Sequence, residues 1–256
     1  MAFVGPVVFG IESRVRIALE QIKDRRAKLA VIVDTPGGVV EVVERIVDTL
    51  RHHYREVVFV IPDRAMSAGT VLALSGDAIL MDYFSVLGPI DPQIEKDKRL
   101  IPALSYLAQF EQLIARSQQG QLTTAEMVLL QKLDLGELQQ FKEARELSIS
   151  LLKTWLVRYK FKDWTRTEGR GLEVTREYKE NRAEEIAKVL SDPQEWHSHG
   201  RGISMETLRG DKLKLKIDDF GADARLARAV RSYFGTLTEY LATRGLTNFV
   251  HTRAYF

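Results

Sequence analysis

Two short apolar, β-branched runs constrain the fold of this chain more than any other feature. Residues 29–33 and residues 57–61 are each too short for a helix and are typical of buried strands. Each run passes through small residues into a helical pattern, over 39–54 and 67–74, and a further strand is expected at 78–81. Because strands that alternate with helices pair in parallel, the sequence predicts an α/β fold with helices on the faces of a parallel sheet.

The second half of the chain is mainly helical in pattern. Apolar residues recur at helical spacing through 103–117, 123–133 and 135–159, and a last helix is expected at 220–243. Residues 160–182 are dense in charge and contain two glycines. This stretch predicts a solvated loop or, alternatively, a mobile lid or a subunit contact.

Composition limits the classes of protein that this chain can be. At 256 residues and 45% hydrophobic, it can bury a full core, and its net charge of +2, with acids and bases interleaved, indicates no nucleic-acid partner. The absence of cysteine excludes disulfides, thiolate metal sites and a cysteine nucleophile. No apolar stretch is long enough to span a bilayer, and residues 1–10 lack the basic region of a signal peptide. We therefore expect a cytoplasmic protein.

The small residues that follow the two runs have a chemistry in common. Gly37 and Gly38 follow the first run and can bring bare backbone N–H groups close to a ligand, because no Cβ intervenes. Ser67 follows the second run at a strand-to-helix turn, and the N–H of Ala68 comes next to it. Taken alone, Ser67 fits a plain helix cap and the glycine pair fits a tight turn. Together, at one edge of a parallel sheet, they predict the nucleophile and oxyanion hole of an acyl-transfer site.

Three motifs in order carry a resemblance to a known family. They are Thr-Pro-Gly-Gly at 35–38, Ala-Met-Ser-Ala-Gly-Thr at 65–70 and Leu-Gly-Pro-Ile-Asp-Pro-Gln at 87–93. The chain resembles the ClpP-class serine peptidases of the ClpP/crotonase fold, and most of all the serine dehydrogenase proteinase family, with signal peptide peptidase A and the NfeD-type peptidases as relatives. The resemblance covers 29–93 and continues weakly through 195–203.

The resemblance implies an architecture and an assembly. The fold implied is a repeated β-β-α superhelical core with a parallel sheet over 1–217, in which 160–182 is a charged loop or lid, followed by a C-terminal helical arm over 218–256. We expect a homo-oligomer, because the arm carries apolar residues suited to packing on a partner, namely Leu226, Val230, Tyr233, Phe234, Leu237 and Leu241. The membrane-anchored relatives have an N-terminal hydrophobic segment that this chain lacks, which favours a soluble enzyme.

The resemblance also implies site residues. Ser67 matches the nucleophile, the N–H groups of Gly38 and Ala68 match the oxyanion hole, and Gly37 shapes the turn. The residues after the glycine pair, Val39 and Val40, would bind the backbone of a peptide that lies extended as an added strand.

A serine peptidase acting on peptide or protein substrates is therefore the main prediction, with no metal or organic cofactor. Whether an ATPase or a membrane partner takes part is left open. Two alternatives remain: a crotonase-fold enzyme acting on an acyl-CoA thioester, and a peptide-binding scaffold without catalysis.

The general base is the part of the site that the sequence does not fix. Ser-His-Asp members of the class carry a histidine in the segment equivalent to 86–91, and none is present here. Lys153 lies among apolar residues that would favour a neutral amine, and Lys142 lies near the same helical face. His199 needs no large pKa shift to act as a base. These three residues are the candidates, and Asp91 is expected mainly to fix a loop.

Overall fold

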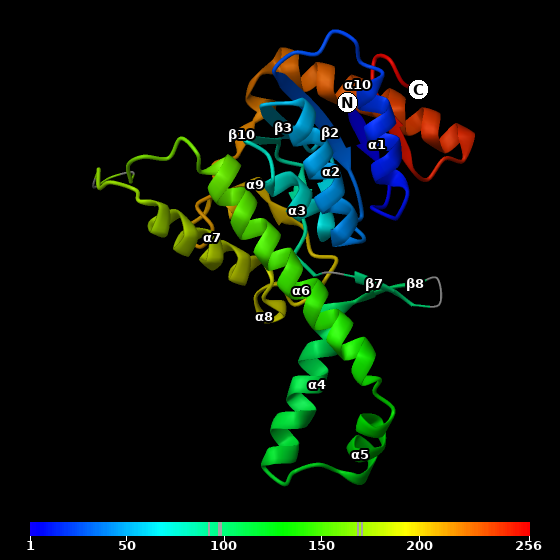
Figure 1. The fold of residues 1–256 in the computed structure, drawn as a ribbon, viewed down its shortest axis with the longest axis vertical. Helices are drawn as coiled ribbons and strands as arrows, with labels where there is room; N and C mark the ends of the chain where they lie inside the picture. Colours follow the sequence, from blue (N-terminus) through cyan, green and yellow to red (C-terminus); the bar gives the residue numbers. More distant parts are fainter. Residues whose placement is uncertain (92, 97–98, 168, 170) are drawn as a thin grey trace.

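The centre of the protein is a six-stranded, mostly parallel sheet (Figure 1). The computed structural model describes residues 1–91, 93–96, 99–167, 169 and 171–256, with side chains described outside 92–105. The strands follow the order β10-β5-β3-β2-β1-β11, and only the pairing of β11 with β1 is antiparallel. Their bounds are β1 Ala2–Val4, β2 Lys28–Asp34, β3 Glu56–Val60, β5 Ala78–Met81, β10 Asp218–Asp219 and β11 Phe249–His251. The predicted α/β fold with a parallel sheet is confirmed.

Helices cover both faces of this sheet (Figure 1). Side chains alternate between the two faces along β2: Val31 and Val33 join the main core cluster, whereas Ile32 packs with residues of the C-terminal helix. The helices in the main cluster are α1 (Ile11–Glu20), α2 (Val40–His53) and α3 (Ala68–Leu74), and the helix on the other face is α10 (Ala224–Arg244). None of the helices within the described residues is both long and apolar enough to cross a bilayer.

A second, three-stranded sheet lies beside the first at the ends of β3 and β5. It consists of β4 (Arg64–Ala65), β6 (Val86–Leu87) and β9 (Ile203–Ser204), with β6 in the middle. After β3 the chain enters β4 and then α3, and after β5 it enters β6. The chain thus passes repeatedly from one sheet to the other, which is the expected β-β-α arrangement.

Helices within residues 103–155 form an arm that projects from the body on the side opposite to α10 (Figure 1). This arm is distinct from the C-terminal arm expected at 218–256. The predicted helices are present, and Thr123 forms a capping box with Glu126 at the start of one of them. Where the arm helices meet, Leu107, Leu138 and Phe141 form a small core of their own. The elements of this region are β7 (Gln93–Lys96), β8 (Arg99–Pro102), α4 (Ala103–Gln118), α5 (Thr124–Gln131), α6 (Leu135–Trp155) and the π-helix η1 (Leu156–Lys160).

The charged segment at 160–182 is only partly a loop. Helix α7 begins at Arg176 and runs to Leu190, so the prediction of a loop as far as residue 182 was wrong for its last seven positions. Thr175 starts this helix early, because its side chain accepts a hydrogen bond from the N–H of Tyr178. Short elements follow: α8 (Pro193–Trp196), α9 (Met205–Arg209) and the 3-10 helix η2 (Phe220–Ala222).

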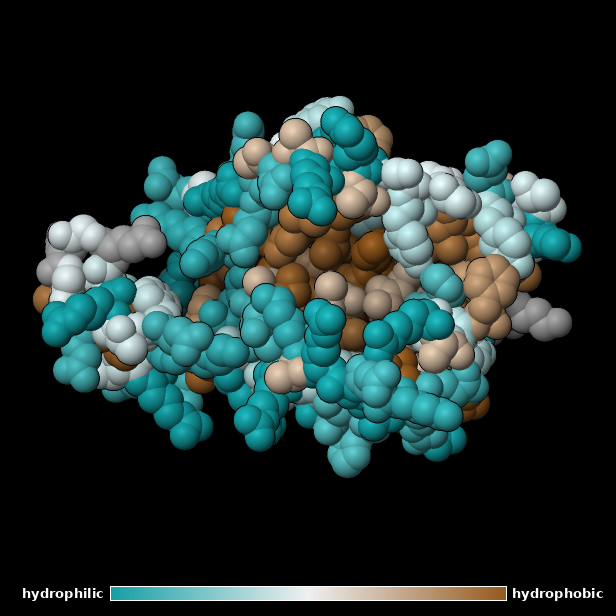
Figure 2. All heavy atoms as spheres, turned by 90° about the horizontal axis from the view of Figure 1, so that it is seen from above, coloured by the Kyte–Doolittle hydropathy of each residue, from teal (hydrophilic) through white to brown (hydrophobic). Residues whose placement is uncertain are grey.

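The C-terminal helix is present, but it belongs to the body. The boundary placed at residue 217 falls where β10 pairs with β5, and β11 adds to the far edge of the same sheet. Val230, Leu237 and Leu241, on the face expected to meet a second copy, are buried against the sheet of their own chain. On the face seen from above the view of Figure 1, apolar side chains gather in the middle, with hydrophilic ones around them (Figure 2).

Candidate active site

Ser67 lies in a sharp turn between a strand and a helix. Strand β4 ends at Ala65, and α3 begins at Ala68. Ser67 has φ 52° and ψ −117°, a conformation that side chains other than glycine rarely adopt and that costs about 1–3 kcal/mol. It occupies the N-cap position of α3, but its side chain makes no capping hydrogen bond. Such a strained strand-to-helix turn is how α/β hydrolases present a nucleophilic serine.

Gly37 lies directly against this turn. A Cβ on Gly37 would be 2.5 Å from the carbonyl oxygen of Met66 and 2.8 Å from the Cβ of Ser67, and its φ is 97°. Gly88 packs equally closely on the same turn, because a Cβ there would be 3.0 Å from the backbone nitrogen of Ser67. The tertiary structure therefore brings together the two motifs that the sequence places thirty residues apart.

The N–H groups of Gly38 and Ala68 are both free to donate within the part of the chain that the structure describes. Gly38 is held by Val7: the N–H of Val7 donates to the carbonyl of Gly37, and the N–H of Val39 donates to the carbonyl of Val7, both at 2.8 Å. These bonds leave the Gly38 N–H unused. Ala68 is the first residue of α3, where an N–H has no partner within the helix. The nitrogen of Ala68 would lie 3.3 Å from a Cβ on Gly37, so the two turns are in contact.

Asp91 connects Ser67 to a histidine. The hydroxyl of Ser67 donates a hydrogen bond of 2.6 Å to the backbone carbonyl of Asp91. The carboxylate of Asp91 lies 2.9 Å from Nδ1 of His199, and its side chain is only 4% exposed, against 24% for the histidine. Sequence reasoning gave Asp91 a loop-fixing role and missed this contact. The signal available for it was an aspartate in a proline-bounded turn directly after a strand of the site.

The position of His199 is set by the second sheet. Strand β9 pairs antiparallel with β6, so that Ile203 lies opposite Leu87 and the segment before β9 lies beside the segment after β6. At the other end of this segment, the indole N–H of Trp196 donates to the carbonyl of Val189 and anchors α8. The strand pairing is long-range in sequence, whereas the Trp196 hydrogen bond spans seven residues, and together they bring His199 to Asp91.

The two candidate lysines lie elsewhere on α6. The ammonium of Lys153 is 2.8 Å from the carboxylate of Glu184 on α7. Hydrogen bonds from Lys153 and Lys188 lower the pKa of Glu184 to about 2. Lys142 is exposed, and its nitrogen lies 6.0 Å from the centroid of the Phe110 ring on the arm. Among the candidate bases, His199 is the one that the described structure links to Ser67, through Asp91.

Val39 and Val40 serve the core as well as the turn. Their side chains are 7% and 2% exposed, and both belong to the main core cluster. The N–H of Val39 is used by Val7. A peptide that lies along this segment therefore has to pair with backbone groups other than that N–H.

Asp34 is a mostly buried carboxylate at the start of the glycine turn, to which the sequence assigned no role. Its Oδ1 makes no hydrogen bond within the described residues, and the closest cation, Nε of Arg64, lies 3.8 Å away. Burial and the neighbouring charge of Asp63 raise the pKa of Asp34 to about 6, against the opposing effect of Arg64. A proton on this carboxyl group is thus exchanged close to neutral pH.

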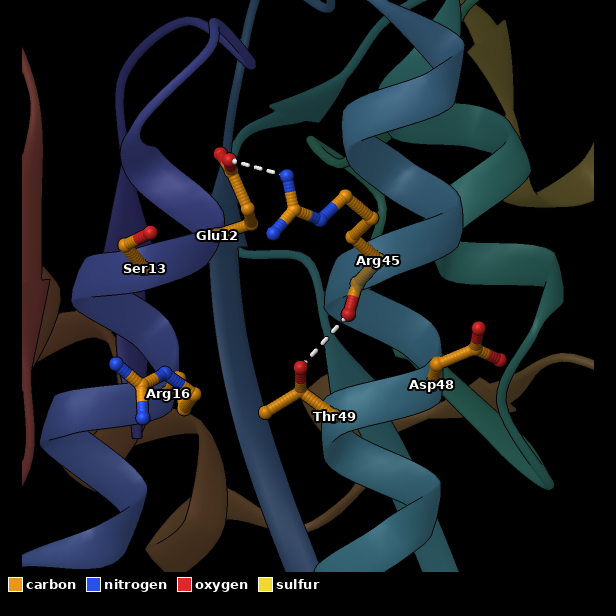
Figure 3. A pocket seen from close by; sticks show the side chains of 6 residues that line it. All are labelled: Glu12, Ser13, Arg16, Arg45, Asp48 and Thr49. Atoms are coloured by element: carbon orange, nitrogen blue, oxygen red, sulfur yellow. Dashed lines mark hydrogen bonds and ion pairs between the residues drawn. The ribbon is translucent and has the colours of Figure 1, made fainter.

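A polar pocket of about 260 Å³ lies apart from this site, on the outer surface of α1 and α2 (Figure 3). Arg45 reaches across it to Glu12, 3.1 Å away, and Thr49 donates to the carbonyl of Arg45. It contains none of the residues around Ser67. Among the described residues, no three acidic or histidine side chains lie close enough together to hold a metal ion.

The turn at Ser67 and the adjoining glycine turn are features of a hydrolase with a serine nucleophile. A family model described as ClpP-like SDH-type serine proteinase matches residues 12–166, more than half of the chain. The chain belongs to this family, and the resemblance inferred from the three motifs is confirmed.

Two archaeal relatives match parts of the chain. Uncharacterized protein MJ0137 of Methanocaldococcus jannaschii is 46% identical over 63 residues, 25% of this chain and 22% of that protein. Uncharacterized protein MJ1495 of the same organism is 30% identical over 173 residues, 68% of this chain and 47% of that protein. The chain thus matches less than half the length of either curated relative.

Two solved structures match this chain at low sequence identity. A mutant of the 1510-N membrane-bound stomatin-specific protease superposes with a TM-score of 0.46 at 12% identity, covering 85% of this chain and 76% of that one. ClpP1 from Listeria monocytogenes superposes with a TM-score of 0.43 at 12% identity, covering 82% of this chain and 84% of that one.

Proposed function

We propose that this protein is a serine endopeptidase in which Ser67 is the nucleophile and His199, oriented by Asp91, is the general base. The observation that carries the proposal is the position of Asp91, whose carbonyl accepts from Ser67 and whose carboxylate meets His199. The strained turn at Ser67 supports it, because proteins retain such strain chiefly where a side chain has to be presented for chemistry.

The reaction follows from these positions. The Asp91 carboxylate accepts from Nδ1 of His199, which leaves Nε2 as the basic nitrogen. When the Ser67 hydroxyl turns away from the Asp91 carbonyl, Nε2 takes its proton and Oγ attacks the peptide carbonyl. The N–H groups of Gly38 and Ala68 hold the resulting oxyanion. His199 gives the proton to the leaving amine. The same nitrogen then deprotonates a water that attacks the acyl group, and it returns that proton to Oγ of Ser67 as the acid product leaves.

Lys153 and Lys142 are the alternative bases, in a Ser-Lys mechanism. Lys153 would first have to leave the carboxylate of Glu184, and Lys142 would have to leave the arm surface. The contact of His199 with Asp91 requires no such rearrangement to orient the imidazole, so the geometry favours the histidine.

A peptide-binding scaffold is the second candidate function, and one observation favours it. Ser67 is 1% exposed, and its hydroxyl is already used by a backbone carbonyl, so the serine as it stands is not presented to a substrate. A protein that kept this state would bind peptides without cleaving them.

Homo-oligomerisation is part of the same proposal, with peptides or proteins as substrates. The helix at the tip of the arm supports it, since Met127, Val128 and Leu129 are about half exposed and α5 buries none of its residues within its own chain. Sedimentation analysis of the full chain tests it, and a monomer at micromolar concentration would contradict it.

Labelling with a fluorophosphonate probe, followed by mass spectrometry of the modified peptide, tests the proposed chemistry. We expect the label on Ser67 of the wild type, little label on His199→Ala, and undiminished label on Lys153→Ala and Lys142→Ala. If only one of the lysine variants loses the label, that lysine is the general base instead of His199. A folded wild type that binds peptides but takes no label would support the scaffold, and turnover of acyl-CoA esters would support the thioester alternative.

A further inference from the structure

Helix α6 packs against three elements that follow residues of the candidate site. It contacts α2, α3 and β7. These elements begin two residues after Gly38, directly after Ser67 and two residues after Asp91. Helix α6 therefore packs on the helix that begins after Ser67, and its middle part lies where it passes from the body to the arm (Figure 1).

Arg145 stands at this point on the inward-facing stripe of α6. The buried residues of the helix are Leu138, Phe141, Ala144, Ser148, Leu151, Leu152 and Trp155. Arg145 comes four residues after Phe141 and three before Ser148, so it shares their face of the helix. Phe141 belongs to the core of the arm, whereas Leu151 and Leu152 belong to the core of the body. Arg145, which is half-buried, therefore lies on this face of the helix, between the residues that belong to the two cores.

The guanidinium of Arg145 has no partner within the described residues. Its Nε is buried and makes no hydrogen bond, and the residue takes part in none of the ion pairs found there. By contrast, Arg51, Arg116, Arg182 and Arg231 each meet a carboxylate. A buried Nε–H without an acceptor is costly, and a ligand that supplies an acceptor there removes this cost.

From this position and this missing partner, we propose that Arg145 binds a carboxylate group of the peptide substrate and so gives the enzyme a preference for acidic peptides. The proposal rests on the proposed peptidase function and names its substrate class. The planar fork of a guanidinium matches a carboxylate with two parallel hydrogen bonds, whereas it has no matching partner in a neutral amide. The carboxylate is either an aspartate or glutamate side chain or the C-terminal carboxylate of a short peptide.

Paired fluorogenic peptides test the proposal on the full chain. One pair differs by Glu against Gln at single positions on either side of the cleaved bond, and a second pair differs by a free carboxylate against an amide at the C-terminus. We expect the wild type to cleave the acidic member of one pair with a kcat/KM about tenfold or more higher, chiefly through KM. The pair that shows the effect identifies the source of the carboxylate.

Variants of Arg145 separate binding from a structural role. Arg145→Gln should remove the preference by raising KM for the acidic peptide to that for the neutral one. Arg145→Lys should retain part of the preference, and Arg145→Glu should turn it toward a peptide carrying lysine. Arg176→Gln, which removes an exposed arginine from α7, is the matched control and should keep the wild-type preference. Fluorophosphonate labelling of Ser67 in each variant shows whether the site is intact.

The possible outcomes distinguish a failure of the role of Arg145 from a failure of the proposed peptidase function. A wild type that cleaves both members of each pair equally, or an Arg145→Gln variant that keeps the acidic preference, would overturn the role of Arg145 and leave the peptidase standing. A wild type that cleaves no peptide and takes no label would overturn both. Loss of activity toward all peptides with normal labelling in Arg145→Lys would assign Arg145 a structural role instead.

Discussion

The carboxylate of Asp91 lies 2.9 Å from Nδ1 of His199, although 108 positions of sequence separate the two residues. The backbone carbonyl of the same aspartate accepts a hydrogen bond from the hydroxyl of Ser67. Asp91 thus holds both groups, one through its main chain and the other through its side chain. Substitution of its side chain changes the contact with the histidine and leaves in place the carbonyl that receives the serine.

That separation makes Asp91→Asn informative. The asparagine keeps the size of the side chain but no longer enforces the imidazole tautomer with a basic Nε2, so we expect kcat for peptide hydrolysis to fall by roughly 10³–10⁴-fold. The kcat of His199→Ala should be lower than that of the wild type by a similar factor. The kcat of the double variant should be little lower still, because the two residues act as a unit. Steady-state kinetics on the three variants measure this. Additive losses would show that the two residues act separately.

Ser67→Ala should abolish hydrolysis, with kcat reduced at least about 10³-fold, without unfolding the chain. Alanine at φ 52° keeps the backbone strain, whereas glycine relieves it. Ser67→Gly should therefore be more stable than Ser67→Ala by about 1 kcal/mol. Denaturant unfolding compares the two. Equal stability, or a more stable alanine variant, would contradict the strained turn.

Gly37→Ala should damage both stability and activity. The added methyl would lie 2.5 Å from the Met66 carbonyl and 2.8 Å from the Ser67 Cβ, at a φ of 97°. We expect the free energy of unfolding to fall by about 2–3 kcal/mol and the remaining folded enzyme to lose most of its turnover. Gly235→Ala is the matched control: it lies in α10 with nothing within 4 Å of a new Cβ. It should raise stability by about 0.5–1 kcal/mol and leave turnover unchanged.

Asp34→Asn should change how stability depends on pH. The folded-state pKa of Asp34 is about 6, above the value of 3.8 expected for an unperturbed aspartate. The folded state therefore binds this proton more tightly, and the stabilisation that results is complete below pH 3.8 and is lost as the pH rises through about 6. The variant should be more stable than the wild type above pH 6, by about 1–2 kcal/mol, and its stability should fall less between pH 4 and 6.

Urea unfolding at a series of pH values measures this difference, with Asp48→Asn, an exposed aspartate on α2, as the control. Parallel pH profiles for the wild type and Asp34→Asn would show that the carboxyl group of Asp34 does not titrate in this range.

Lys153→Ala should have little effect on stability or on turnover. Its ion pair with Glu184 joins two partly exposed side chains, so we expect a loss of stability below about 1 kcal/mol and a kcat within twofold of the wild type. Thermal unfolding and peptide hydrolysis check both expectations. A loss of turnover comparable to that of His199→Ala would move the general base to the lysine.

Local pattern alone determined the elements of this fold and two of the turns at its site. The apolar run that became β2 and the helical spacing that became α2 are encoded by neighbouring residues, which decide whether a segment can bury one face. Gly37, Gly38 and Ser67 stand out for the same reason, because each is a small residue at the end of a buried strand. The family motifs depend on the same short segments and were visible without coordinates.

Only the tertiary structure decided the features that depend on contacts between residues far apart in the sequence. The pairing of β9 with β6 brings His199 to Asp91, and the ion pair with Glu184 takes Lys153 away from the candidate site. The apolar face of α10, which the helical spacing led us to expect against a second copy, is buried on the sheet of its own chain. Helical spacing shows that a face is apolar, and sequence neighbours show that a lysine has an apolar setting. Neither shows which distant segment will meet that face or that charge, because the partner is chosen by the folding of the whole chain.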